Sequence, residues 1–97
     1  MELQFQEYNI SEQHIYQIKY VYEELKKMSL DKLWYDISVD DECVFFYGEK
    51  KDVKFFFNIF YDENENEALV NVSTIDKKYT IENKVEISLN KLKKIIK

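Results

Sequence analysis

The chain contains no arginine and no proline, and it has a single glycine, a single cysteine and a single histidine. One glycine cannot build the glycine-rich loops that cradle phosphates. One cysteine excludes an internal disulfide, and together with one histidine it falls short of a tetrahedral zinc set. Because arginine is the usual bidentate reader of phosphate and guanine, an acidic chain without it is a poor candidate for direct nucleic-acid binding.

Long apolar runs and a cationic leader are also missing. The first ten residues, MELQFQEYNI, carry carboxylates and no basic side chain, so the sequence predicts no secretory signal. No segment reaches the roughly 18 to 20 apolar residues of a membrane span. These features predict a cytoplasmic protein without membrane contact.

The residues that most often carry catalysis or metal binding are sparse. His14 is predicted in the first turn of a helix, as a solvated or capping side chain without a Ser–His–Asp or Cys–His arrangement around it. Cys43 falls in an apolar strand and is predicted to be a small core residue, not a nucleophile. Residues 62–66 match the start of a calcium loop, but Glu67 replaces its glycine. We therefore predict no enzyme, no catalytic residue, no metal and no cofactor.

What the chain does have is apolar and acidic character. Its 97 residues are 45% apolar and 16% aromatic, enough for one domain, residues 1–97, with an aromatic core. The net charge is −5, and it is uneven along the chain. Residues 1–75 hold seven lysines and sixteen acids, whereas residues 76–97 hold seven lysines and three acids. A surface polarised in this way favours a basic partner for its acidic part.

Hydrophobic periodicity predicts one long helix followed by short strands. Ser11 is a suitable helix N-cap, and apolar residues then recur at helical spacing before the period changes to two. The predicted elements are a strand at 2–8, a helix at 11–29, strands at 33–39, 43–47, 53–61, 68–75 and 79–87, and a short helix at 88–97. Because the connections are short, neighbouring strands must be antiparallel. The sequence therefore predicts an α+β fold, one long N-terminal helix packed on an antiparallel β-meander of four to six strands, with a short C-terminal helix.

The strand VKFFFNIFY, residues 53–61, places aromatic rings on both faces of this sheet. Its odd positions are all apolar and are predicted to face the long helix. Its even positions are mixed and are assigned to the opposite face together with Trp34, Val44 and Phe46. The last helix is too short to roof that face, so we expect residues 89–97 to cover it only in part. The predicted partner-binding residues are an aromatic set and an acidic set: Trp34, Phe46, Phe56, Phe60, Asp36, Asp40, Asp41 and Glu42.

These features together favour a small acidic protein-binding module. Contiguous aromatic surface usually marks a contact site, and aromatic residues are enriched in interface cores. The most concrete interpretation is an inhibitor that caps a basic protein partner, of the bacterial immunity or phage anti-defence (anti-CRISPR) type. Two alternatives stay open. One is a small-ligand carrier or enzyme with a pocket between helix and sheet, and the other is a structural homodimer that buries its aromatic faces.

Overall fold

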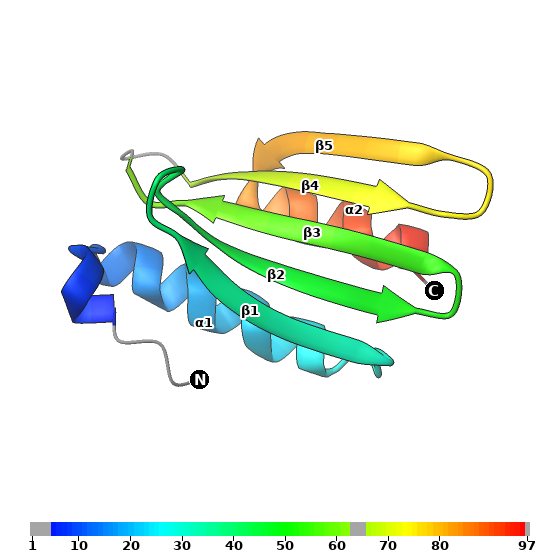
Figure 1. The fold of residues 1–97 in the computed structure, drawn as a ribbon, viewed down its shortest axis with the longest axis horizontal. Coiled ribbons are helices and arrows are strands. Elements are labelled where there is room, and N and C mark those ends of the chain that lie inside the picture. The colour runs from blue at the N-terminus through cyan, green and yellow to red at the C-terminus, as the bar shows by residue number, and fades with distance from the viewer. Residues whose placement is uncertain (1–4, 63–65, 97) are drawn as a thin grey trace.

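A computed structural model describes residues 5–62 and 66–96, and it confirms the predicted α+β fold (Figure 1). One long helix precedes a five-stranded antiparallel sheet with the order β1-β2-β3-β4-β5, and a shorter helix follows it. The elements are η1 (Phe5–Tyr8), α1 (Glu12–Lys26), β1 (Lys32–Ser38), β2 (Cys43–Lys50), β3 (Val53–Phe60), β4 (Glu67–Ser73), β5 (Lys78–Lys84) and α2 (Val85–Ile96). Within the described ranges, neither helix combines the length and apolarity that crossing a bilayer requires.

The N-cap of α1 is the one that the sequence predicts. Ser11 has an extended backbone, and its Oγ accepts a hydrogen bond of 3.2 Å from the His14 backbone N–H. The helix ends at Lys26, three residues before the predicted end at 29, and Ser29 then takes a left-handed conformation with φ of 54°. The fully buried apolar residues of α1 recur three and four positions apart and face the sheet: Ile18, Val21 and Leu25.

Other boundaries differ from the prediction at both ends of the chain. Phe5–Tyr8 forms a 3₁₀ helix and not a strand, and residues 2–4 of the predicted strand lie outside the described part. Strand β2 runs through Gly48, where a turn was predicted. Gly48 fits there because the buried Phe55 ring lies across it, and a Cβ would come within 2.2 Å of that ring. Helix α2 begins at Val85, whose N–H donates to the Asn66 carbonyl at 2.7 Å.

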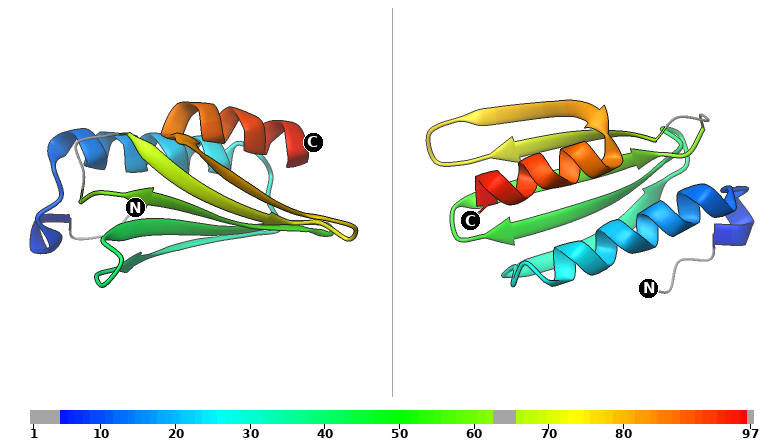
Figure 2. Two further views of the ribbon diagram at one scale, coloured as in Figure 1. Left: turned by 90° about the horizontal axis from the view of Figure 1, so that it is seen from above. Right: turned by 180° about the vertical axis from the view of Figure 1, so that it is seen from behind.

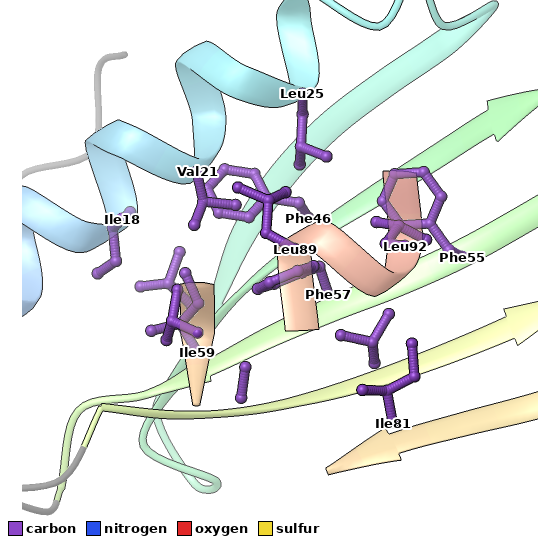
Figure 3. Packing of buried hydrophobic residues seen from close by; sticks show 14 of the residues in the cluster. Ile18, Val21, Leu25, Phe46, Phe55, Phe57, Ile59, Ile81, Leu89 and Leu92 are labelled. Carbon is purple, nitrogen blue, oxygen red and sulfur yellow. The ribbon is translucent and has the colours of Figure 1, made fainter. Parts of the chain in front are cut away.

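Both helices lie on the same face of the sheet (Figure 2). Helix α2 packs closest to β4 and β5, and its buried residues Leu89 and Leu92 join those of α1 over the sheet (Figure 3). The expectation that residues 89–97 partly roof the opposite face is therefore wrong. Helix α2 follows β5 without a loop, and its apolar stripe packs against the same core as α1. We call the sheet face that carries the helices the inner face and the other one the outer face.

Phe46 lies on the inner face, which corrects its predicted placement. In the ladder it stands directly opposite Tyr35 on β1 and Phe57 on β3, and directly opposed residues share a face. Its side chain is completely buried, and its ring stacks on Tyr22 of α1 at 5.9 Å. Val44 is inward for the same reason. Residues 43–47 are apolar at every position, so their sequence shows no alternation from which the inner residues of β2 could be chosen.

A hydrogen-bonded ion pair ties the two helices together. The Glu24 carboxylate of α1 accepts from Lys93 Nζ of α2 at 2.6 Å and from Lys27 Nζ at 2.9 Å. These hydrogen bonds lower the pKa of Glu24 to about 2, because both lysines favour the ionised carboxylate. The interaction joins the end of α1 to α2 on their shared face of the sheet. It contributes to stability only while Glu24 is ionised.

Two adjacent phenylalanines of β3 test the face assignment. Phe57 is completely buried, whereas Phe56 is 41% exposed on the outer face. Phe57→Ala should lower the free energy of unfolding by about 3–5 kcal/mol, since it removes a core ring and leaves a cavity. Phe56→Ala should cost much less, because its ring is already partly in water. Urea denaturation of both variants measures the difference, and equal losses would show that the two faces are assigned wrongly.

Acid titration tests the tie between the helices. The pKa of Glu24 is lowered from its ordinary 4.5 to about 2 in the folded chain, so this contribution is complete above pH 4.5 and is lost as the pH falls toward 2. Glu24→Gln should therefore reduce stability at neutral pH and flatten its dependence on pH in that window. Glu23→Gln is the control, because the Glu23–Lys26 pair is exposed to solvent. The same acid dependence in wild type and Glu24→Gln would contradict the assignment.

Candidate interaction surface

Four aromatic rings gather on the outer face, which neither helix covers. We call them the aromatic cluster, and its members are Trp34, Phe45, Tyr47 and Phe56. The ring centroids are 5.2 Å apart for Trp34–Tyr47, 4.9 Å for Tyr47–Phe56, 6.0 Å for Trp34–Phe45 and 6.1 Å for Phe45–Phe56. These spacings are typical of favourable aromatic pairs. Trp34 is 48% exposed and Phe56 is 41% exposed, so the cluster presents aromatic surface to solvent.

Strand register brings these rings together. Trp34, Tyr47 and Phe56 stand directly opposite one another on β1, β2 and β3 and form one row across the sheet. We call it the aromatic row. It continues through Asn71 on β4 and Thr80 on β5. Phe45 lies two residues from Tyr47 on the same strand, so its ring falls diagonally against the row.

A short polar network positions Tyr47, the middle residue of the aromatic row. The Tyr47 hydroxyl donates to Glu49 Oε2 at 2.5 Å, and this carboxylate also lies 3.8 Å from Lys32 Nζ. The hydrogen bond to Glu49 raises the pKa of Tyr47, since it stabilises the protonated phenol. This hydrogen bond restricts the orientation of the Tyr47 ring within the row.

The acidic residues predicted for partner binding lie beside the cluster, at one end of the sheet. Asp36 stands on the outer face of β1 opposite Phe45, and Asp40, Asp41 and Glu42 form the exposed β1–β2 turn. The Ser38 hydroxyl donates to Asp41 at 2.9 Å, which orders the turn. Within the described part of the chain, no ion pair engages these four carboxylates.

The opposite end of the outer face carries lysines. Lys32, Lys54 and Lys78 occupy one row, on β1, β3 and β5, immediately before the aromatic row in each of these strands. A hollow of about 340 Å³ opens beside them, and Tyr47, Phe56, Lys54 and Lys78 are among its lining residues. Glu49 of β2 stands in the same row as these lysines, and Lys84 lies beyond Glu82 on β5. On the edge strands β1 and β5, the outer face thus carries a lysine, then a residue of the aromatic row, then an acid.

The structure places two of the four predicted aromatic residues in the cluster. Trp34 and Phe56 belong to it, whereas Phe46 is buried on the inner face. Phe60 lies on the outer face opposite Cys43 but is half-buried and makes no ring contact with the cluster among the described residues. Sequence reasoning missed the other two members, Phe45 and Tyr47. Pairing β2 with the confidently assigned inner residues of β3 would have found them.

The two chemically reactive side chains are both buried. His14 was predicted as a solvated or capping side chain, and it is 4% exposed and lies at the helix cap, so the capping alternative holds and the solvated one does not. Its Nδ1 lies 2.8 Å from Ser11 Oγ at the helix cap, and its Nε2 has no hydrogen-bond partner in the described structure. Cys43 is a core residue as predicted, and burial, with smaller contributions from nearby carboxylates, raises the pKa of its thiol to about 11. Such a thiol stays protonated at neutral pH and is a weak nucleophile.

The described part of the chain holds no group of three His, Cys, Asp or Glu side chains that could bind a metal. Residues 63–65 of the partial calcium-loop match lie outside that part. A second hollow, of about 400 Å³, opens between α1 and the start of α2, on the helix side of the molecule. Its lining residues are Gln13, Tyr16, Gln17, Tyr20, Val85 and Glu86. Between α1 and the sheet, fully buried side chains such as Ile18, Val21 and Phe57 pack together.

Comparison with known proteins gives no relative for the chain. No protein-family model, no curated protein and no solved structure matches it.

Proposed function

We propose that the protein is a binding module that contacts a protein partner through its outer face and acts as an inhibitor by covering that partner. The observation that carries the proposal is the aromatic cluster, which lies uncovered on the sheet with Trp34 and Phe56 about half exposed. The core is built on the inner face and does not need these rings. Their gathering in one exposed patch is what an interaction surface requires.

The cluster has the composition of an interface centre. Trp and Tyr are enriched among the residues that dominate binding energy, and such residues lie near the middle of a contact and are surrounded by polar groups. Trp34 and Tyr47 are adjacent on the row, and the Tyr47 hydroxyl is already held by Glu49. Rings on paired strands have little rotational freedom left to lose when a partner covers them. The sheet therefore presents a rigid apolar centre.

The acidic end favours a partner with a basic surface. Asp36 and the turn residues Asp40, Asp41 and Glu42 concentrate four carboxylates next to the cluster, without ion pairs to other described residues. Charges placed in this way accelerate the encounter with an oppositely charged protein and suppress other partners. Lysine and arginine side chains of the partner would meet the carboxylates while its apolar groups cover the rings.

Inhibition by covering needs a rigid complementary surface and no chemistry of its own. A partner that binds nucleic acid or another polyanion presents a basic cleft, and carboxylates can occupy the positions that phosphates take there. A bacterial immunity protein or a phage anti-defence protein acts on such partners. The buried, protonated Cys43 and the capping position of His14 are compatible with this role, since both side chains are buried and covering a partner needs no reactive group on the surface.

Paired variants on the two sides of the molecule test this proposal. The partner is first isolated by cross-linking in the native cells and purified, and its affinity is then measured by calorimetry. Trp34→Ser with Phe56→Ser should weaken binding at least about 30-fold, because interface-centre aromatics each contribute on the order of 1–2 kcal/mol or more. The control is Tyr16→Ser with Ile87→Ser, which removes exposed apolar residues from the helix side and should leave the affinity unchanged.

Charge reversal separates the acidic end from the aromatic cluster. Replacing Asp40, Asp41 and Glu42 by lysine should slow association with the purified partner at low salt, while the unfolding midpoint changes little. The proposal fails if the outer-face double variant folds and binds as wild type does. It also fails if only the helix-side control loses binding.

A further inference from the structure

We propose that the outer face is self-complementary, and that in the free protein it closes on the outer face of a second copy whose strands run in the opposite direction. This goes beyond the proposed function, because it says what occupies the surface before a partner arrives. The argument depends on the order of charges along the strands of the sheet.

The two edge strands carry the same pattern on the outer face. On β1 the order is Lys32, Trp34, Asp36, and on β5 it is Lys78, Thr80, Glu82. In a meander, alternate strands run in the same direction, so both lysines lie at one end of the sheet and both acids at the other. On each edge strand, a lysine and an acid therefore stand at equal distances on either side of the aromatic row.

A two-fold axis that runs along the aromatic row converts this order into contacts. The axis crosses all five strands in the plane between the two copies, so each strand lies over its own copy in the reverse direction. Lys32 then faces Asp36 of the second copy, and Lys78 faces Glu82 of the second copy. Each pair occurs twice, as an isologous interface requires. An axis parallel to the strands would instead place lysines over lysines, which like-charge repulsion disfavours.

Apolar surface fits in the same arrangement. The aromatic row lies on the axis, so Trp34, Tyr47 and Phe56 meet the same three residues of the second copy. Leu69, on the outer face of β4, comes over Ser73 of the second copy, because the two lie at equal distances from the row. Ser73 lines the hollow of about 340 Å³, which gives this aliphatic side chain a place to enter.

The size of the face predicts a weak dimer. Five strands about 4.8 Å apart and about seven residues long give a footprint of roughly 550 Å² per copy. The total of roughly 1,100 Å² is only slightly above the about 1,000 Å² expected of a specific interface. The net charge of −5 on each copy also opposes association at long range. We therefore expect a dissociation constant on the order of 10–100 μM, weak enough for a tight partner to displace the second copy.

The Lys78–Glu82 contact is the one to test, because neither residue forms an ion pair with another described residue. Lys32, in contrast, already lies 3.8 Å from Glu49 within the chain. Lys78→Glu places two acids on each β5 outer face, and Glu82→Lys places two lysines there. Each variant alone should repel its own copy. A mixture of the two variants should restore opposite charges at every contact, whereas dimers formed by another surface would not respond in this way.

Sedimentation velocity from about 1 to 500 μM measures the association of the purified protein. Wild type should pass from monomer to dimer in this range, each single variant should raise the dissociation constant about tenfold or more, and the mixture should return it to the wild-type value. Circular dichroism of each variant establishes that the fold is retained.

A wild-type protein that stays monomeric up to 500 μM overturns the inference, as does a dimer that the charge variants do not weaken or the mixture does not restore. The failure of the proposed function is distinguishable from this result. If the protein is a strict monomer that binds its partner through the aromatic cluster, only the dimer proposal is refuted. If mixing restores the dimer but Trp34→Ser with Phe56→Ser leaves the affinity for the partner unchanged, only the proposed function is refuted.

Discussion

Burial of apolar side chains from two helices against a single face of the sheet is the constraint on which the rest of the structure depends. Phe57, Phe46 and Phe55 point to this face, and Ile18, Leu25 and Leu92 meet them from α1 and α2. Burying each of these side chains stabilises the fold by about 1.5–3 kcal/mol, a large part of the 5–15 kcal/mol by which a domain is usually stable. Because side chains alternate along a strand, fixing these residues inward fixes every intervening residue outward.

The outer face is the consequence of this choice. With both helices on one side, the described chain provides no second layer for the other face, and yet the outward positions of β1, β2 and β3 hold the aromatic cluster. A sheet face meant only for water is commonly polar at such positions. The cluster, the acidic turn and the lysine row share this one surface, and their combination is the basis of the proposed interaction with another protein.

The sequence indicated the helix cap at Ser11, all five strands of the sheet and the inward side of β3, because these depend on local chemistry and on clear periodicity. The orientation of β2 was not predictable in the same way. Its first five residues are all apolar, so only the pairing of Phe46 with Phe57 decides which residues point inward. The placement of α2 was mispredicted because the length of a helix says how much of a face it can cover, but only the direction of its apolar stripe says which face. The inverted orientation of β2 is why Phe45 and Tyr47 were missed while Trp34 and Phe56 were found.

The central claim is that the chain leaves its outer aromatic cluster uncovered, and the fluorescence of Trp34, the only tryptophan, tests it most directly. Acrylamide quenching is measured at submicromolar protein, where sedimentation shows a monomer, and is repeated at several hundred micromolar and with the purified partner. The account predicts ready quenching and a red-shifted emission maximum in the dilute monomer, with protection and a blue shift when a second copy or the partner covers the face. A tryptophan that is shielded from acrylamide in the dilute monomer would contradict the account.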